Sequence, residues 1–384
     1  MRVIDKKIKS LFMLDPDVTY LNHGSFGACP EPIFNSLITW QRKLEYEPVK
    51  HLAHDIYDHL EESRKALSEY INCYKDDVVF FPNPSSALNT VLRSLHLKKG
   101  DEILTTDHEY GAMDRAWRYI SKKVGIKYIN QPIQLPLQSK QEVVNQFVKG
   151  ITKKTKIIFL SHISSPTAVI FPVKEICQIA KERNIITIVD GAHVPGHIPL
   201  DIQEIDPDFY TGACHKWMCS PKGVAFLYVK PIFQKIIEPL VISWGYEAEQ
   251  PSHSQFLDYL QWQGTNDMSA YLTIPDTIKF LKDNNWKSVA KECRALNLKA
   301  REMISEELKS DLICSQDFLG QMSTINLDFK DPIESQIEFY NKYKIQIPFL
   351  IWNNKKFIRL SIQVYNDEND INYLIGSLKD YLNR

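Results

Sequence analysis

Short apolar runs alternate with segments of helical period from about Tyr70 onward. The runs begin at Val78 (VVFFP), Glu102 (EILTT), Lys156 (KIIFLSHIS), Ile185 (IITIVD) and Gly223 (GVAFLYV). Several of them are continuously apolar and rich in β-branched residues, which is typical of strands in a mostly parallel sheet covered on both faces. Helices are expected between them, for example over residues 173–183, where Ile176, Ile179 and Ala180 recur at helical spacing. The pattern predicts an α/β fold.

The alternation of strands and helices ends after Pro275. A long helical stretch covers residues 276–308, two apolar strands follow at Met322 (MSTINLDF) and Lys356 (KFIRLSIQV), and a last helix begins at Asp370. This order predicts a separate, smaller α+β unit. The chain contains no internal repeat or low-complexity linker, so we expect the long helix to join the two units.

The composition is that of an ordinary globular protein. The chain has 384 residues, of which 44% are hydrophobic and 24% are charged. This length favours two domains, or one large domain with an appended smaller one. Its 46 basic and 47 acidic residues create no field that would recruit nucleic acid or an anionic membrane, so neither partner is expected. Without a signal-peptide core or a run of eighteen apolar residues, we expect a protein that is neither secreted nor membrane-spanning. The seven scattered cysteines favour a reducing, cytoplasmic setting.

An acid at the end of one apolar run and a lysine shortly after it carry the candidate chemistry. Asp190 ends IITIV, at the edge where open parallel sheets collect ligands. Lys216 lies in GACHKWMCSP, where small, apolar and aromatic neighbours should lower the pKa of its ammonium. Pyridoxal phosphate (PLP) requires this pair, because its aldehyde forms a Schiff base with a lysine and a carboxylate keeps its ring nitrogen protonated. Taken alone, Asp190 also fits a turn or a helix cap, and most lysines are solvated.

The segment FFPNPSSALNTVLRSL predicts a strand, a break and a helix. The first turn of this helix offers unpaired backbone N–H groups and the hydroxyls of Ser85 and Ser86, which suit a phosphate group. Without other support, the same residues favour a plain helix N-cap.

The segment KHLAHDIYDHL contains residues of the kind that bind metals. His51, His54 and Asp58 lie near one helical face at a spacing that could ligate a metal. Amphipathic surface helices produce such clusters freely, and no further ligand stands out in the sequence. No metal is therefore expected.

Seven segments in order resemble the class V aminotransferase family of PLP fold type I, and within it the isopenicillin N epimerase-like group. They are YLNHGSFGACP, NPSSALNTVLRSL, TTDHEYGAMDRAW, VDGAHVPGHIPLD, HKWMCSPKG, QGTNDMSAYLTIP and FIRLSIQVYND. The resemblance implies a mostly parallel central sheet and a smaller α+β C-terminal domain. It divides the chain into an N-terminal segment (1–50) that lines the active site and packs on the small domain, a large PLP-binding domain (51–275) and the small domain (276–384).

The resemblance also implies roles for residues around the cofactor. Lys216 would be the catalytic lysine in the Schiff base, Asp190 would pair with the ring nitrogen, and His193 would hydrogen-bond the ring hydroxyl. Tyr110 would stack on the ring. The phosphate would be held by three residues, Ser85, Ser86 and His215.

Four further residues match positions that face the substrate or the neighbouring subunit in the family. Arg359 would bind the α-carboxylate of an amino-acid substrate, a task suited to a planar two-pronged donor. Asn22 and His23 would face the substrate from an N-terminal loop. Thr265 would reach the phosphate of the neighbouring subunit, which implies a homodimer. From the local sequence alone, Arg359 would be a strand arginine facing solvent, and Thr265 would be a loop threonine. Asn22 and His23 would belong to a turn.

The predicted reaction begins with loss of the substrate's α-proton and delocalisation of the resulting carbanion into the cofactor. Epimerase-like or β-eliminating chemistry of the C–S lyase type is favoured, with an aminotransferase or a cysteine desulfurase-like enzyme as the alternative. A desulfurase would need a nucleophilic cysteine after MSTINLDF, but none follows Cys314. Ser165 and Ala213 also depart from the asparagine and serine typical of desulfurases. A non-catalytic binding protein of this fold is a further alternative, which the presence of both Asp190 and Lys216 disfavours.

Overall fold

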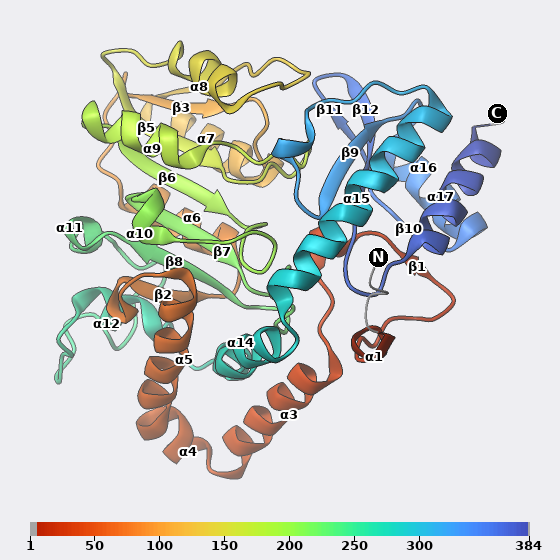
Figure 1. Ribbon diagram of the computed structural model, residues 1–384. Helices are drawn as coiled ribbons and strands as arrows, with labels where there is room; N and C mark the ends of the chain where they lie inside the picture. Colours follow the sequence, from red (N-terminus) through yellow and green to blue (C-terminus); the bar gives the residue numbers. More distant parts are fainter. Residues whose placement is uncertain (1–5, 383–384) are drawn as a thin grey trace.

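Seven strands form the central sheet of the larger unit in the computed structural model, which describes residues 6–382 (Figure 1). Their order across the sheet is β2-β8-β7-β6-β5-β3-β4. Six strands run in one direction, and β8 alone runs opposite to them. The predicted mostly parallel sheet is therefore confirmed. The strands are β2 (Val78–Phe81), β3 (Glu102–Thr106), β4 (Lys127–Gln131), β5 (Thr155–Ser161), β6 (Ile186–Gly191), β7 (Phe209–Ala213) and β8 (Ala225–Val229).

Alternate residues of β2 show that helices cover both faces of this sheet. Val79 and Phe81 belong to one hydrophobic cluster, together with residues of α6 (Pro84–Ser94), α7 (Gly111–Val124) and α12 (Gln255–Gln261). Val78 and Phe80 belong to a second cluster on the opposite face. The helices that contribute to this second cluster include α5 (Ile56–Ile71), α8 (Lys140–Val148), α9 (Val173–Glu182) and α14 (Ile274–Asp283).

The apolar runs identified in the sequence correspond to β2, β3, β5, β6 and β8, and the expected helix over residues 173–183 is α9. Two strands of this seven-stranded sheet were not predicted. β4 (KYINQ) is a polar strand at the edge of the sheet with no fully buried residue, so it lacks an apolar run. β7 (FYTGA) is fully buried, but its glycine and alanine weaken the strand pattern.

The smaller unit is built around a three-stranded antiparallel sheet of order β11-β12-β9. Its strands are β9 (Met322–Asn326), β11 (Phe349–Trp352) and β12 (Lys355–Ser361). Helices α15 (Trp286–Leu308), α16 (Pro332–Tyr343) and α17 (Glu368–Tyr381) share a hydrophobic cluster with this sheet. The N-terminal segment joins this unit, because β1 (Thr19–Tyr20) pairs in parallel with β10 (Ile345–Gln346).

The prediction of one helix over residues 276–308 is wrong, because the structure contains two helices there, α14 and α15. Asn285 lies between them with a left-handed backbone (φ 46°), a conformation that asparagine tolerates better than most residues and that interrupts a helix. α14 packs against α5 of the larger unit, whereas α15 packs against β9. Figure 1 shows α15 running between the two units. The predicted domain boundary at residues 275/276 stays a prediction.

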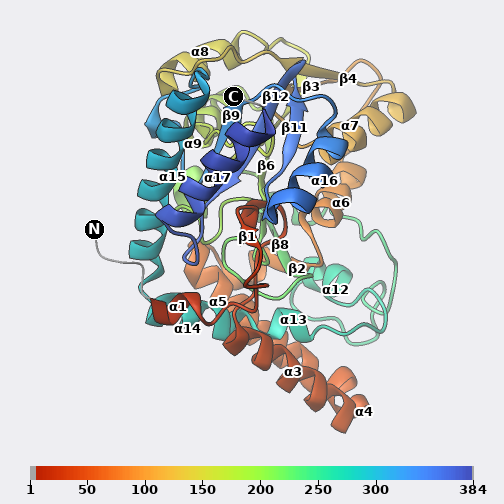
Figure 2. The same cartoon turned by 90° about the vertical axis from the view of Figure 1, so that its right-hand side faces the viewer.

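The remaining elements are short, apart from α3, and connect the larger pieces. They are α1 (Lys6–Lys9), α2 (His23–Phe26), α3 (Glu31–Tyr46), α4 (Pro48–Lys50), the π-helix η1 (His51–Asp55), η2 (Lys75–Asp77), α10 (Ile202–Ile205), α11 (Pro231–Gln234), α13 (Ser269–Leu272) and η3 (Gln316–Phe318). Figure 2 shows α3 and α4 extending from one end of the body. Among residues 6–382, no helix has both the length and the apolar character that crossing a bilayer requires.

Candidate active site

Lys216 follows β7 in the loop that leads to β8, at the edge of the sheet where β6 also ends. Its Nζ lies 3.4 Å from Nε2 of His193. Burial lowers the pKa of the Lys216 amine to about 8; nearby Arg359 lowers it further, and Asp190 partly opposes the shift. An amine with this pKa is neutral in an appreciable fraction at pH 7 to 8, as a nucleophile or a base requires.

Asp190 lies at the end of β6, and His193 lies in the loop that follows this strand. Asp190 is the penultimate residue of this strand and aligns with Thr211 of β7, so the acid and the lysine loop share one edge of the sheet. Burial raises the pKa of Asp190, while a hydrogen bond from the backbone N–H of Ala192 (2.9 Å to Oδ1) and the charge of Lys216 lower it. Burial also holds the pKa of His193 well below 6.5, so its imidazole is neutral. The predicted grouping of Lys216, Asp190 and His193 is present in the structure.

Arg359, on β12, connects the small unit to this site. Its Nη1 donates to the carbonyl (2.7 Å) and the hydroxyl (3.0 Å) of Ser165, and its Nη2 donates to Oγ of Ser25 (2.9 Å). Its Nε is buried and has no hydrogen-bond partner among the described residues. Burial lowers the pKa of the guanidinium to about 10, which leaves it charged at neutral pH. A buried cation with an unused donor suits an incoming carboxylate.

The N-terminal loop packs against the backbone of Lys216. Gly27 has φ 69°, and a Cβ there would lie 2.2 Å from the carbonyl oxygen of His215. His23 is fully buried; its Nε2 donates to the carbonyl of Lys216 (3.0 Å) and its Nδ1 accepts from the Tyr365 hydroxyl (2.8 Å). Protein groups thus hold both ring nitrogens of His23, and its substrate contact stays a prediction.

Asn22 is half-buried, and its substrate contact stays a prediction. Its Oδ1 accepts the hydroxyl of Ser25 at 2.5 Å. Since Ser25 Oγ in turn accepts from Arg359, Asn22 is linked to the guanidinium through one side chain.

The predicted phosphate residues lie at the start of α6 and in the lysine loop. Asn83 caps α6 by accepting the N–H of Ser86 at 2.8 Å, and the half-buried side chains of Ser85 and Ser86 flank this helix N-terminus. His215 donates Nδ1–H to the carbonyl of Val224 (2.8 Å), which leaves Nε2 for another partner. Burial lowers the pKa of His215 to about 4. A helix N-terminus with two hydroxyls is a suitable anion site.

Tyr110 and Thr265 are more exposed than the other predicted residues. Tyr110 is 46% exposed at the N-cap of α7, and it acts electrostatically on Arg359. Thr265 lines a surface hollow together with Val49, Trp244 and Trp262. The structure therefore places Tyr110 near the guanidinium and Thr265 in a hollow of the outer surface.

Two buried groups near the site were not predicted from the sequence. Glu109 accepts the N–H (2.9 Å) and hydroxyl (2.7 Å) of Ser161, the residue that pairs with Asp190 in the sheet. Burial raises the pKa of Glu109 to about 7. Trp217 donates its indole N–H to Nδ1 of His193 at 3.3 Å. The position of Glu109, at the end of a strand and beside Tyr110, could have drawn attention to it. No local pattern indicates the partner of Trp217.

The histidines considered as metal ligands do not form a metal site. His51 is buried in η1 beside Trp40 and His59, whereas His54 and Asp58 are exposed. Within residues 6–382, no group of three or more histidine, cysteine or acidic side chains could hold a metal ion.

Comparisons with known proteins find relatives that match this chain over nearly its whole length. Two curated relatives are isopenicillin N epimerase of Amycolatopsis lactamdurans (30% identity, 96% of each chain) and hercynylcysteine sulfoxide lyase of Schizosaccharomyces pombe (28% identity, 99% of this chain and 98% of the relative). A putative L-cysteine desulfhydrase of Oryza sativa subsp. japonica is 26% identical over 96% of this chain and 83% of its own length.

Solved structures with the same fold include a cysteine desulfurase from Thermococcus onnurineus NA1 (TM-score 0.85, 20% identity, 100% of this chain and 99% of the other). Another is the cystine C–S lyase C-DES bound to its product cysteine persulfide (TM-score 0.82, 21% identity, 95% and 98%). The fold is thus that of PLP-dependent enzymes of fold type I. The profile of the family "Aminotransferase class-V" matches residues 42–374. This chain therefore belongs to the class V aminotransferase family, whose members depend on PLP.

Proposed function

We propose that this chain is a PLP-dependent enzyme that binds an amino acid, withdraws its α-proton and expels a sulfur-containing β-substituent. The observation that carries the proposal is the convergence of the Lys216 amine with the His193 imidazole, 3.4 Å away, and with the charge of Asp190. Relatives named as a sulfoxide lyase and as cysteine desulfhydrases support C–S cleavage. Epimerisation at Cα is the second candidate, because two relatives at 29–30% identity are isopenicillin N epimerases.

The residues at the site fit PLP. The phosphate would lie at the start of α6 beside Ser85 and Ser86, with Nε2 of His215 as a third contact. Asp190 would face the ring nitrogen, because a buried carboxylate with a raised pKa gains most from a cationic partner. The neutral His193 would bind the ring hydroxyl. When bound, PLP supplies an electron sink that makes the α-proton of an amino acid acidic.

Lys216 is the residue that moves the proton. Its neutral amine accepts the α-proton at Nζ, which the lowered pKa of about 8 permits near neutral pH. In the elimination, the electrons left by the α-proton end in a Cα=Cβ double bond, the C–S bond breaks, the sulfur leaves with the bonding electrons, and Lys216 returns the proton to it. Water then converts the released unsaturated amine to a keto acid and ammonia. Epimerisation instead needs a proton delivered to the opposite face of Cα, a task for a group other than Lys216. One amine is therefore sufficient for elimination.

Arg359 orients the substrate. A carboxylate at the guanidinium would receive the unused Nε–H, while Ser165 and Ser25 hold the two terminal nitrogens in place. This fixes the α-carbon relative to Nζ of Lys216. Tyr110, half-exposed and electrostatically coupled to Arg359, would cover the cofactor ring from the open side.

The cysteines argue against a persulfide-forming desulfurase, which needs a reactive thiolate near the substrate. Cys314, the last cysteine of the chain, precedes β9, and burial raises its pKa to about 11. Burial raises the pKa of the other six as well, so all are thiols at neutral pH. None of the seven cysteines, all of which lie among the described residues, forms a disulfide bond, and this supports the predicted cytoplasmic setting.

We also propose that the protein is a homodimer in which each active site includes a residue of the neighbouring subunit. Large apolar side chains are exposed around the hollow that Thr265 lines, including Val49 (74%) and Trp244 (80%). Exposed apolar groups gathered in this way are typical of an interface between subunits. Thr265 would then contact the phosphate bound by the neighbouring subunit.

The reaction is tested by incubating the PLP-loaded protein with a panel of L-amino acids in deuterated water. A keto acid released together with a thiol or sulfide, and absent from Lys216→Ala, is the result expected for β-elimination. Deuterium at Cα with inversion and no other product would favour epimerisation, and amino transfer to an added keto acid would favour an aminotransferase. A colourless protein that takes up no PLP would contradict the proposal in favour of a non-catalytic binding protein.

A further inference from the structure

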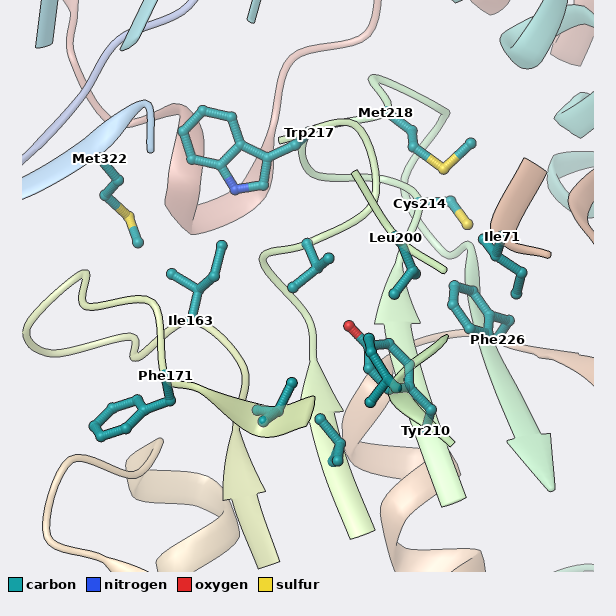
Figure 3. Packing of buried hydrophobic residues seen from close by; sticks show 14 of the residues in the cluster. Ile71, Ile163, Phe171, Leu200, Tyr210, Cys214, Trp217, Met218, Phe226 and Met322 are labelled. Carbon is teal, nitrogen blue, oxygen red and sulfur yellow. The ribbon is translucent and has the colours of Figure 1, made fainter. Parts of the chain in front are cut away.

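Trp217 follows the candidate catalytic lysine directly and is fully buried. Its ring stacks on His197, with ring centroids 4.0 Å apart and planes at 28°, and lies 4.9 Å from the ring of His23. In Figure 3, Trp217 lies near Met322 and above the ends of the strands. From this position the indole N–H reaches Nδ1 of His193 at 3.3 Å.

The indole nitrogen can act only as a hydrogen-bond donor. The nitrogen that faces it, Nδ1 of His193, must therefore be an acceptor and carry no proton. Burial keeps His193 neutral, and a neutral imidazole has one proton on its ring nitrogens. That proton must consequently be on Nε2, the nitrogen 3.4 Å from Nζ of Lys216.

A second histidine holds the tryptophan in this position. Nε2 of His197 accepts the backbone N–H of Gln321 at 2.6 Å, so its proton is on Nδ1, which donates to the carbonyl of His193 at 2.9 Å. Gly320 admits this ring, because a Cβ there would lie 2.2 Å from His197 Nε2. The indole, stacked on a ring that is fixed at both nitrogens, has little freedom to turn away from His193.

We infer that Trp217 is a positioning residue that holds His193 as the Nε2–H tautomer, so that the imidazole presents a donor to Lys216 and to the cofactor ring. The Nε2–H group can donate a hydrogen bond to the lone pair of a neutral amine. It cannot form a hydrogen bond with an ammonium group, because an ammonium group also has only donors. Trp217 thereby favours the free amine of Lys216. The consequence for the cofactor rests on the proposed function, but the tautomer does not.

Other charged groups around Lys216 act in addition to this effect. Arg359 disfavours the ammonium form of Lys216, and Asp190 favours it. His193 itself faces Lys216, Arg359 and His197. None of these groups is removed by a change at Trp217, so the contribution of the indole N–H can be measured separately.

The first test uses the apo protein, uniformly labelled with ¹⁵N, and reads the histidine ring nitrogens by NMR. The His193 signal is assigned by its loss in His193→Phe. The expected result at about pH 9, where an amine with a pKa of about 8 is mostly neutral, is a neutral ring with the proton on Nε2. A proton on Nδ1 in the wild-type protein would overturn the inference, whether or not any variant folds and whether or not PLP binds.

The second test compares Trp217→Phe with a matched control, Trp286→Phe. Trp286 is also buried, but its indole nitrogen has no hydrogen-bond partner among the described residues. In Trp217→Phe, we expect His193 to populate the Nδ1–H tautomer. We also expect the pH midpoint for formation of the yellow Lys216–PLP adduct to rise by about half to one unit, since one hydrogen bond is lost. The control should change neither measurement.

The outcomes separate the inference from the proposed function. An unchanged His193 tautomer and an unchanged midpoint in a folded Trp217→Phe protein would refute the role of Trp217, even if the enzyme were active. A protein that formed no adduct at all, but showed the tautomer change, would refute the proposed function and leave the inference intact.

Discussion

Nη1 of Arg359 donates to both the carbonyl and the hydroxyl of Ser165, at 2.7 and 3.0 Å, across the junction of the two units. Ser165 follows β5 of the large sheet, and Arg359 lies on β12 of the small one. The guanidinium that we assign to the substrate carboxylate is therefore fixed by the other unit before any substrate arrives. Such preorganisation reduces the ordering that binding requires.

Replacement of Arg359 by alanine should lower kcat/KM for the amino-acid substrate by about 100-fold or more, because a buried charge-assisted contact is lost. Arg359→Lys should recover only part of the loss, since an ammonium cannot reproduce the planar fork. Steady-state kinetics, with PLP content measured in parallel, provide the check. Arg301→Lys is the control, because Arg301 is also buried but donates to the carbonyl of Cys314. Unchanged kinetics in Arg359→Ala would remove the carboxylate assignment.

Replacement of Gly27 by alanine should destabilise the fold and disturb the lysine loop. The backbone of Gly27 (φ 69°, ψ 169°) has a conformation that is essentially restricted to glycine and costs an alanine about 1–3 kcal/mol, and the overlap with the His215 carbonyl and the Lys216 backbone adds about 1–3 kcal/mol. Gly100→Ala is the matched control, because Gly100 has φ 91° but no atom within 4 Å of the added Cβ. Urea unfolding should show the larger loss for Gly27→Ala. Equal losses in the two variants would mean that the N-terminal loop does not constrain Lys216.

Stability should fall as the pH drops below about 6.5. Burial lowers the pKa of His23, His162 and His197 to about 3. Between pH 6.5, the ordinary pKa of a histidine, and about pH 3, the unfolded chain binds a proton at each of these histidines and the folded chain does not. Each therefore removes about 1.4 kcal/mol of stability per pH unit. Glu109 acts oppositely between pH 4.5 and 7, because burial raises its pKa to about 7 and the folded chain binds its proton.

The contribution of one histidine can be isolated with His162→Gln. Denaturant unfolding between pH 6.5 and 5 should show a slope that is shallower by about 1.4 kcal/mol per pH unit than in the parent protein. Parallel slopes for His162→Gln and the parent would show that His162 is not held neutral.

Subunit mixing tests the shared site at Thr265. Lys216→Ala and Thr265→Arg should each be inactive alone, the second because a large cation would crowd the neighbouring phosphate site. Unfolding and refolding the two together should restore about one quarter of the wild-type activity, since half of the dimers would be mixed and each would contain one intact site. Sedimentation should show dimers throughout. A monomeric protein with full activity would contradict the shared site.

The sequence predicted the groups whose chemistry is visible along the chain. Asp190 and Lys216 could be found because each follows an apolar strand of one parallel sheet. The contacts of His23 could not be found, because its partner Tyr365 is 342 residues away. The bond between Trp217 and His193 depends on the relative orientation of two loops, which periodicity does not encode. The break at Asn285 was missed because apolar residues continue at helical spacing on both sides of it.

The most direct measurement of the central claim is to reduce the PLP-loaded protein with borohydride and identify the modified residue by peptide mass spectrometry. We expect a yellow protein that bleaches on reduction, with the phosphopyridoxyl group on Lys216 and no stable adduct in Lys216→Ala. A modification distributed over surface lysines, or one that persists in Lys216→Ala, would contradict it.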